Sequence, residues 1–343
     1  MKTILVTGCA GFIGSNYIRN KLAKKKNIQI VNIDALTYAG NRHNIENLDN
    51  RHIFIKGNIC DSDLLNEIFN KYDIETVINF AAESHVDRSI LDPGSFVRTN
   101  VSGTQCLLNA CKKHWNLATN KNTFEYKKNV KYLQISTDEV YGTLGKTGKF
   151  TETSPIAPNS PYSASKASAD LLVRAYNHTY NLPTLITRCS NNYGPYQFPE
   201  KLIPLAIKNI FLGKKVPIYG NGLQIRDWIY VLDHCDGIDT VLHKGKIGEV
   251  YNIGCENEWT NIDLVKCIIN QLDKSEDLIE HVSDRLGHDV RYAIDNHKIQ
   301  TELGWKPKIN FEKGIKLTID WYCDNREWMN NIETGEYLHN RTG

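Results

Sequence analysis

Three glycines follow the first β-rich run of the sequence at a spacing typical of one kind of strand–helix junction. The run "TILVTG" (3–8) leads directly into "CAGFIG", so Gly8, Gly11 and Gly14 form a G-x-x-G-x-x-G pattern that enters a segment with helical spacing. Glycines at such a junction permit a tight turn and let the backbone approach a pyrophosphate at the positive N-terminus of the helix. The pattern predicts a dinucleotide-binding βα unit, the alternative being an ordinary tight turn.

Two acidic residues near strand ends indicate which dinucleotide is bound. Asp34 ends "IQIVNID", 20 residues after Gly14, where a carboxylate can accept hydrogen bonds from the adenosine ribose. The same charge repels a 2′-phosphate, so we expect NAD as the cofactor rather than NADP. Asp61 follows the third β-rich run in "NICD", and we expect it to reach the adenine.

The first half of the chain alternates β-rich runs with helical segments. The expected strands are 3–8, 28–34, 52–59, 75–82 and 130–137, with helical spacing at 12–25 and 61–72 between them. Most of these runs are nearly continuous in apolar residues, as parallel strands covered on both faces are. The alternation predicts an α/β fold with a Rossmann-type doubly wound parallel sheet. From about residue 190 the pattern becomes irregular and rich in proline, so we expect a smaller α/β C-terminal lobe that binds the substrate.

The domain organisation follows from the points at which the alternation of strands and helices ends. We expect a dinucleotide-binding domain at 1–189, to which 228–254 returns, and a second lobe formed by 190–227 and 255–343. The polar segment 116–129 is expected to be a surface insertion before the fifth strand.

Composition and charge exclude several classes of partner. The 343 residues are 41% hydrophobic, enough for a sizeable core, and the net charge is only +2, without a long block of one sign. We therefore expect no binding to nucleic acid or to a membrane surface. Nine cysteines, an odd number with no C-x-x-C pair, indicate reduced thiols in the cytoplasm rather than disulfides or a metal site. We also expect no signal peptide and no membrane-spanning segment.

"PYSASKASADLLVRAY" places Tyr162 and Lys166 four residues apart, on one face of a predicted helix. A phenol with a pKa near ~10 is a poor base at neutral pH. We expect the Lys166 ammonium, together with a positively charged nicotinamide ring, to lower the pKa of Tyr162. Lys166 is also expected to hold the nicotinamide ribose. The alternative is an exposed pair on a helix, since this spacing also arises by chance.

"ISTDEVYG" (135–142) carries two adjacent acids, Asp138 and Glu139, at the end of an apolar run. Two neighbouring carboxylates repel each other, so their position at a strand end favours a role as one acid and one base. We expect burial and the neighbouring Glu139 to raise the pKa of Asp138, and the two acids to titrate as a coupled pair. The alternative is a solvated acidic turn.

The motifs "TGCAGFIG", "STDEVYG" and "YSASK" together resemble the extended short-chain dehydrogenase/reductase superfamily. "FAAESHVDRSI", "NNYGPYQFPEKLIP", "IYGNGLQIRDW" and "DRLGHDVRY" narrow the resemblance to the dTDP-glucose 4,6-dehydratases, from residue 1 to about residue 322. The Thr-Asp-Glu triplet distinguishes these enzymes from the sugar epimerases, which usually lack the acid pair.

The resemblance implies a three-step reaction on a nucleotide-linked hexose. Tyr162 takes the O4 proton while hydride leaves C4 for NAD, which makes a 4-ketone. Glu139 then removes the acidified C5 proton while Asp138 protonates the departing O6 hydroxyl, with Thr137 orienting the O4 region. Hydride finally returns to C6 and a proton to C5, giving a 4-keto-6-deoxy sugar.

The resemblance also implies which residues hold the two ligands. The expected cofactor-binding residues are Gly8, Gly11, Phe12, Ile13, Gly14, Asp34, Ile59, Asp61, Ala81, Ala82, Thr99, Tyr162, Lys166 and Asn192. The expected substrate-binding residues are Ser84, His85, Thr137, Asn191, Lys201, Leu202, Tyr219, Arg226, Asn261, Arg285, His288 and Tyr292. Arginine suits the diphosphate because its planar guanidinium binds phosphate oxygens in pairs.

The sequence departs from the family motif at Leu286, where proline is usual, and at Val290, where arginine is usual. The second change removes one candidate phosphate ligand, although Arg291 remains beside it. The chain is expected to form a homodimer through the apolar helical segment 95–114. Three alternatives stay open: a UDP-glucose 4,6-dehydratase, a nucleotide-sugar 4-epimerase or decarboxylase, and a binding scaffold without catalysis.

Overall fold

The computed structural model describes residues 1–120, 123–284 and 288–341. Seven parallel strands form its main sheet, in the order β12-β8-β7-β4-β1-β2-β3. The order reverses between β1 and β4, and ligands of doubly wound sheets bind beyond the strand ends at such a point. The strands are β1 (Lys2–Thr7), β2 (Ile28–Asp34), β3 (His52–Lys56), β4 (Ile74–Asn79), β7 (Lys131–Thr137), β8 (Thr184–Cys189) and β12 (Val250–Ile253).

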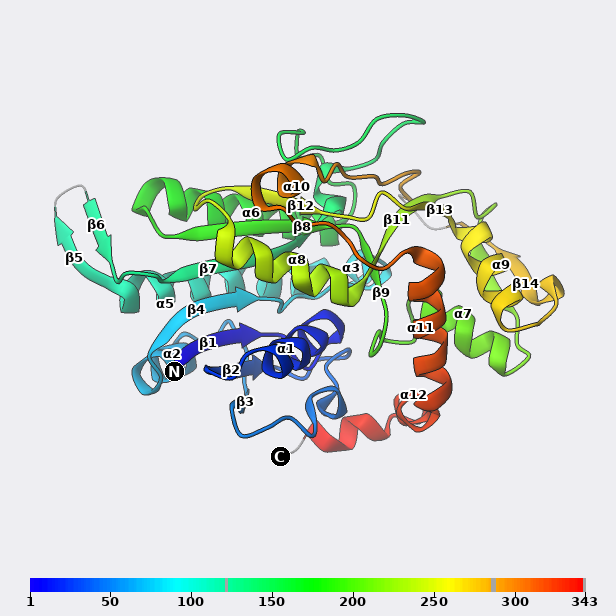
Figure 1. The fold of residues 1–343 in the computed structure, drawn as a ribbon, viewed down its shortest axis with the longest axis horizontal. Helices are drawn as coiled ribbons and strands as arrows, with labels where there is room; N and C mark the ends of the chain where they lie inside the picture. Colours follow the sequence, from blue (N-terminus) through cyan, green and yellow to red (C-terminus); the bar gives the residue numbers. More distant parts are fainter. Residues whose placement is uncertain (121–122, 285–287, 342–343) are drawn as a thin grey trace.

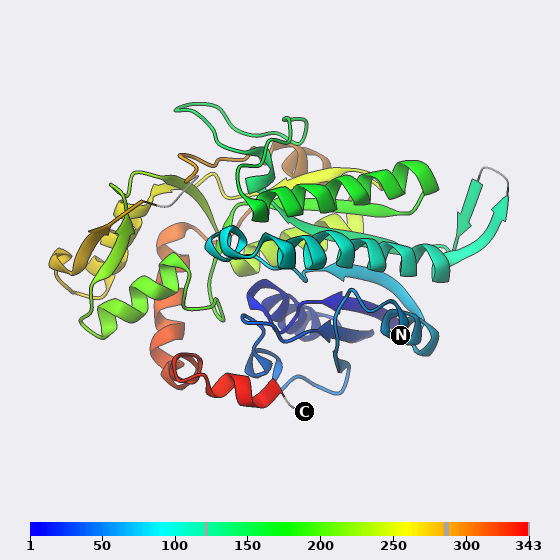
Figure 2. The ribbon, with the colours of Figure 1, turned by 180° about the vertical axis from the view of Figure 1, so that it is seen from behind.

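Helices cover both faces of this sheet, which explains why its strands are apolar along almost their whole length. On the face seen in Figure 1 lie α1 (Phe12–Lys24), α8 (Val231–Lys244) and α10 (His297–Leu303). Figure 2 shows the opposite face, covered by α2 (Ser62–Lys71), α5 (Thr104–Trp115) and α6 (Pro161–Tyr180). The predicted Rossmann-type fold and its five strands are confirmed.

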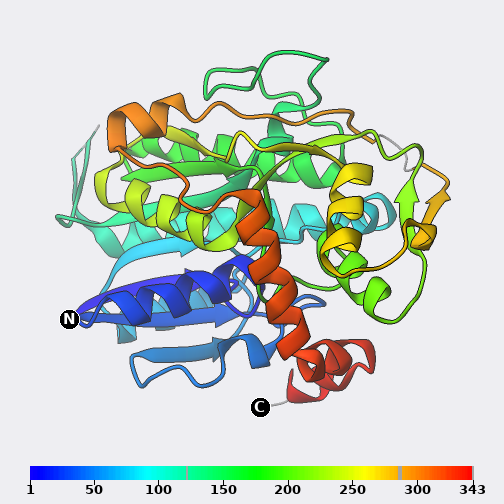
Figure 3. The same cartoon turned by 45° about the vertical axis from the view of Figure 1, so that its right-hand side comes forward.

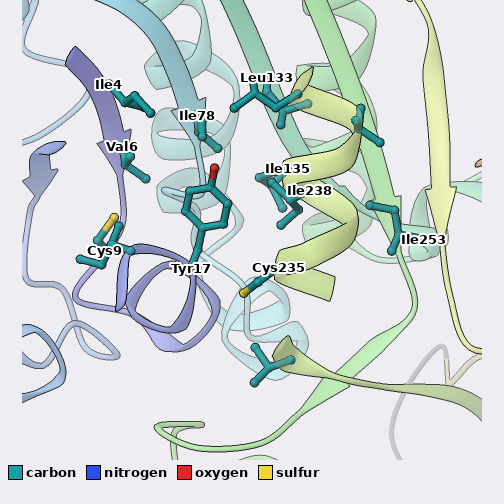
Figure 4. Packing of buried hydrophobic residues seen from close by; sticks show 14 of the residues in the cluster. Ile4, Val6, Cys9, Tyr17, Ile78, Leu133, Ile135, Cys235, Ile238 and Ile253 are labelled. Carbon is teal, nitrogen blue, oxygen red and sulfur yellow. The ribbon is translucent and has the colours of Figure 1, made fainter. Parts of the chain in front are cut away.

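The core between the sheet and the front helices is built from side chains of β1, β4, α1 and α8 (Figure 4). Tyr17 of α1 lies between Ile78 of β4 and Ile238 of α8, and it is almost completely buried. Full burial of an apolar side chain such as isoleucine in this core contributes roughly 1.5–3 kcal/mol. This packing holds the start of α1, and with it the glycine-rich loop, against the end of β1.

A second lobe with its own core follows the sheet (Figure 3). Its helices are α7 (Leu202–Phe211), α9 (Asn261–Gln271), α11 (Phe311–Asp324) and α12 (Arg326–Glu333). Its strands are β9 (Asn191–Tyr193), β10 (Val216–Tyr219), β11 (Ile225–Tyr230), β13 (Glu258–Thr260) and β14 (Ile279–Val282). Residues 231–253 pack on the main sheet, and so does α10, which the sequence had assigned to the second lobe. The exact domain division stays a prediction.

Several short elements connect these layers. The polar segment 116–129 contains a two-stranded hairpin, β5 (Asn116–Asn120) and β6 (Thr123–Tyr126). The segment 95–114 is one long helical stretch, in which α4 (Pro93–Phe96) continues through the π-helical η2 (Val97–Gly103) into α5. The remaining short helices are η1 (Arg42–Ile45), α3 (Val86–Leu91), η3 (Asp138–Tyr141), η4 (Glu276–Leu278) and η5 (Glu336–Arg341). Within the described ranges, no helix has the length and apolar character that crossing a membrane requires.

A buried ion pair joins α6 to β8. The Arg188 guanidinium donates to the Asp170 carboxylate at 2.9 Å, and both side chains are almost inaccessible to water. Replacing Asp170 by alanine should lower the free energy of unfolding by about 3–5 kcal/mol, because it leaves the Arg188 charge buried without its counter-ion.

Urea denaturation of the D170A variant measures this loss. The matched control is Asp73→Ala, which breaks an exposed pair with Lys127 and is expected to change stability little. Equal unfolding midpoints for the Asp170→Ala variant and the unaltered chain would contradict the prediction.

Candidate active site

One cavity of about 530 Å³ lies at the carboxyl ends of the main-sheet strands, between the sheet and the second lobe. Its volume is in the range usual for small-molecule sites. All but two of the predicted site residues line this cavity. The exceptions are Asp61, which is discussed below, and Arg285, which is outside the described residues.

The glycine-rich loop forms part of the wall of this cavity and packs closely against neighbouring backbone. Gly8 has a φ of +73°, and a Cβ atom there would lie 2.7 Å from the backbone nitrogen of Ala81. A Cβ atom on Gly14 would lie 2.6 Å from the Gly8 carbonyl oxygen. Side chains at either position would therefore clash with backbone, so both must be glycine for the loop to keep this shape.

Asp34 holds the glycine-rich loop as well as lining the cavity. Its carboxylate accepts hydrogen bonds from the backbone N–H of Ala10 and of Leu36, each at 2.8 Å. These bonds tie the loop after β1 to the loop after β2. The acid predicted from its spacing thus has a structural role in addition to its predicted contact with the ribose.

The expected contact between Asp61 and the adenine stays a prediction, and Asp61 has a structural role beside the cavity lining. The Asp61 carboxylate caps α2, where it accepts from the backbone N–H of Asp63 at 3.1 Å and of Leu64 at 3.0 Å. Asn58 and Ile59 line the cavity at this level instead. An aspartate directly before a helix is a common N-cap, and that signal was already present in the sequence.

Tyr162 and Lys166 lie on successive turns of α6 and both line the cavity. The Lys166 ammonium donates to the Ile135 carbonyl oxygen at 2.7 Å. Burial raises the pKa of Tyr162 well above its usual value, and the Glu139 charge raises it further, while a hydrogen bond with Thr137 lowers it. A phenol removed from water beside two acids resists ionisation, and the lowering expected from Lys166 together with a positively charged nicotinamide ring stays a prediction. Burial also lowers the pKa of Lys166.

The acid pair follows a change of backbone geometry. Strand β7 ends at Thr137, and the 3₁₀ helix η3 begins at Asp138, so the two acids do not alternate between opposite faces of the sheet. Asp138 is only 1% exposed, whereas Glu139 is half-buried. Burial, followed by the Glu139 charge, raises the pKa of Asp138 well above the usual carboxyl range. This confirms the expected direction, and the pair consists of one acid that keeps its proton and one more accessible acid.

The predicted substrate residues of the second lobe lie around the far end of the cavity. The guanidinium of Arg226 donates to the carbonyl oxygens of Ile225 at 2.8 Å and Asp289 at 2.9 Å, and lies 4.4 Å from the centre of the Tyr292 ring. Lys201 reaches across the cavity and donates to the Ser84 carbonyl oxygen at 3.3 Å. These cations are held in place by protein carbonyls, and their contacts with a substrate stay predictions.

Several buried polar atoms in the cavity wall have no hydrogen-bond partner among the described residues. Two of them are acceptors, the Oδ1 atom of Asn191 and the Oε1 atom of Glu200. Buried polar atoms are normally paired, so these two suit the hydroxyl groups of a bound sugar. Glu200 was not predicted as a site residue, although it stands in the motif "FPEKLIP". Tyr38 and Asp289 also line the cavity and were not predicted, although Asp289 stands in the motif "DRLGHDVRY".

Arg291 does not take the place of the missing arginine at position 290. Its guanidinium forms two bonds with the Glu258 carboxylate, at 2.6 and 2.7 Å, and it is outside the residues that line the cavity. Val290 is 61% exposed. The idea that Arg291 remains available for a phosphate is therefore wrong, since its charge is already paired.

The cysteines are free thiols, as expected. Cys189 lines the cavity, but burial raises its pKa to about 12, so it is protonated and unreactive at neutral pH. Among the residues that the structure describes, no cluster of three or more histidine, cysteine or acidic side chains is arranged to hold a metal ion.

Comparison with known proteins relates this geometry to a family. The family model described as GDP-mannose 4,6 dehydratase matches residues 5–318. A relative from Xanthomonas campestris pv. campestris (strain B100), named dTDP-glucose 4,6-dehydratase, is 52% identical, and the alignment covers 100% of this chain and 99% of the relative.

Solved structures agree with the fold over almost the whole chain. The dTDP-glucose 4,6-dehydratase of Bacillus anthracis str. Ames, solved in complex with NAD, has a TM-score of 0.88 at 49% identity and covers 97% of this chain and 100% of its own. The enzyme of the same name from Streptomyces venezuelae, solved with NAD and TYD bound, has a TM-score of 0.88 at 44% identity and covers 95% and 98%. The chain therefore belongs to the nucleotide-sugar 4,6-dehydratase family, among relatives that carry the name dTDP-glucose 4,6-dehydratase.

Proposed function

We propose that this protein is an NAD-dependent dTDP-glucose 4,6-dehydratase, a lyase that converts dTDP-glucose to dTDP-4-keto-6-deoxyglucose. The observation that carries the proposal is the contrast between buried Asp138 and half-buried Glu139, beside Tyr162 and Lys166 in one cavity. Such a pair offers a proton donor and a proton acceptor to neighbouring carbons of one sugar. The names of the relatives favour the same reaction.

The residues around the glycine-rich loop fit NAD. Gly8, Gly11 and Gly14 line the cavity at the start of α1, where a pyrophosphate would fit, and Asp34 suits a ribose without a 2′-phosphate. When bound, NAD supplies the hydride chemistry, by accepting a hydride from C4 of the sugar and returning it to C6. Lys166 and Asn192 would hold its nicotinamide end.

Tyr162 accepts the O4 proton in the first step. Its burial opposes ionisation, and the hydrogen bond with Thr137 offsets part of that cost by stabilising the phenolate. Because Thr137 precedes the acid pair directly, the same short segment supports proton removal at O4 and elimination at the next two carbons. Asn191 and Glu200 would position the sugar through their unpaired oxygen atoms.

Elimination uses the acid pair after C4 has become a ketone. The ketone acidifies the C5 proton, which Glu139 removes, and the C5 electron pair forms the C5–C6 double bond as the C6–O6 bond breaks. Asp138 transfers its proton to O6, so that water rather than hydroxide leaves. Glu139 later returns a proton to C5. The raised pKa of Asp138 keeps that proton available.

We further propose that the chain acts as a cytoplasmic homodimer. Large apolar side chains are exposed on neighbouring helices of the face seen in Figure 2, including Val97 at 52% in η2 and Leu171 at 53% in α6. Exposed apolar side chains on adjacent helices are typical of subunit contacts. Free thiols throughout the chain suit a reducing compartment.

Turnover of sugar nucleotides by the purified protein tests the function. We expect dTDP-glucose to give a 4-keto-6-deoxy product, and UDP-glucose to react roughly tenfold more slowly, the lower bound for one methyl contact. NMR of the product identifies the reaction. Inactivity with dTDP-, UDP- and GDP-linked hexoses would overturn the proposal, and an inverted or decarboxylated sugar would replace it with one of the alternative activities.

The variants Asp138→Asn and Glu139→Gln should each reduce dehydration by about 10²- to 10⁴-fold, the usual contribution of a general acid or base. Oxidation at C4 should persist, because it depends on Tyr162, and NADH absorbance should accumulate. The matched control is Asp73→Asn, the same change at an exposed acid outside the cavity lining, which should leave dehydration within about twofold. Full dehydration rates in both acid-pair variants would exclude the assigned roles.

Dehydration should depend on pH through Asp138. The rate should fall as the pH rises through the pKa of Asp138, since this acid must carry a proton, and the raised pKa places the fall above the usual carboxyl range. In a kcat–pH profile, the residual activity of the Asp138→Asn variant should no longer fall as the pH rises. Retention of the same fall in that variant would assign it to another group.

A further inference from the structure

The segment 326–341, which comprises α12 and η5, connects the second lobe with the cofactor side of the first domain. Its buried side chains belong to the core of the second lobe. Its last helix, η5, lies against η1 in the loop after β2. Figures 1 and 3 show this red segment close to the blue loops of the first domain.

One chain of hydrogen bonds joins this segment to the glycine-rich loop. The Trp328 indole N–H donates to Oδ1 of Asn44 at 2.8 Å, and Nδ2 of Asn44 donates to the carbonyl oxygen of Ala10 at 2.8 Å. Ala10 lies between Gly8 and Gly11, and its own N–H is held by Asp34. Trp328, Asn44 and Ala10 are all buried, so water does not replace these bonds.

A second attachment lies before η1 in the chain, in the loop after β2. The Tyr337 hydroxyl donates to the carbonyl oxygen of Tyr38 at 2.8 Å. The Tyr337 ring packs against Phe198, with 5.9 Å between ring centres, and Phe198 packs edge-on against Tyr38 at 5.8 Å. Tyr38 and Phe198 both line the cavity. The segment 326–341 therefore supports two separate parts of the cavity wall without lining it.

We propose that Trp328 and Tyr337 are positioning residues that slow the release of NAD. The inference rests on the proposed function, in which the hydride removed from C4 must return to C6 of the same sugar. Loss of the reduced cofactor between these steps would leave an oxidised sugar that cannot be completed. The loops after β1 and β2 must break their contacts with Trp328 and Tyr337 before they open. These contacts therefore lengthen the time for which the dinucleotide stays bound.

The dissociation rate of NAD from the purified full chain tests the proposal without any substrate. Trp328→Phe keeps the aromatic ring but loses the N–H, and we expect release to become roughly fivefold faster, the effect of losing one neutral hydrogen bond. Tyr337→Phe should have a similar effect through its separate contact. The double variant should show about the product of the two factors, as independent sites do.

The matched control is Trp305→Phe. Trp305 is a buried tryptophan of the main-sheet core, and its indole N–H has no hydrogen-bond partner among the described residues. Its replacement makes the same change in ring size without breaking a hydrogen bond. NAD release should therefore stay within about twofold of the unaltered chain.

A double-mutant cycle with Asn44→Ala separates positioning from general loss of stability. Because Trp328 acts through Asn44, Trp328→Phe should have no further effect on NAD release in the Asn44→Ala background. Unchanged release in both single variants, equal acceleration in W305F, or full additivity with N44A would each overturn the inference. Failure of an NAD-loaded chain to dehydrate dTDP-glucose would instead count against the proposed function alone.

Discussion

Removal of Asp138 from water is the condition on which the rest of the site depends. A carboxyl group that is 1% exposed next to a second acid keeps its proton, and a neutral donor beside an ionisable acceptor is what elimination across C5 and C6 requires. The arrangement needs β7 to end at Thr137, because a continued strand would point Asp138 and Glu139 to opposite faces.

Buried polar contacts connect this turn to the helix that carries the other catalytic residues. Tyr141, in the same 3₁₀ turn as the acid pair, accepts a hydrogen bond from Arg188 at 3.0 Å and donates to Asn252 at 2.9 Å. Arg188 in turn pairs with Asp170, which lies one turn beyond Lys166 on α6. One network of hydrogen bonds thus connects β8, β12, α6 and the catalytic turn. Removing its polar groups from water costs free energy, and their mutual bonds offset this cost only while each group keeps its partner.

Predictions based on periodicity and on motifs with a defined local geometry were accurate. The five strands and the glycine turn are local consequences of apolar runs and of the freedom of glycine to adopt a positive φ. The partners of individual charged groups did not follow from local sequence. Asp61 caps a helix, Arg291 is paired with Glu258, and burial raises the pKa of Tyr162. Each outcome depends on neighbours that are distant in sequence or on burial.

The sequence by itself determined the class of fold, the dinucleotide loop and the family, because these are encoded in short segments whose residue types have direct steric or chemical meaning. Only the tertiary structure decided which of these groups meet in one cavity, how deeply each is buried, and what supports them. Hydrogen bonds link Trp328 through Asn44 to Ala10, and Trp328 and Asn44 are 284 positions apart in the sequence. No local pattern encodes such a contact, because it exists only where two independently packed cores approach each other.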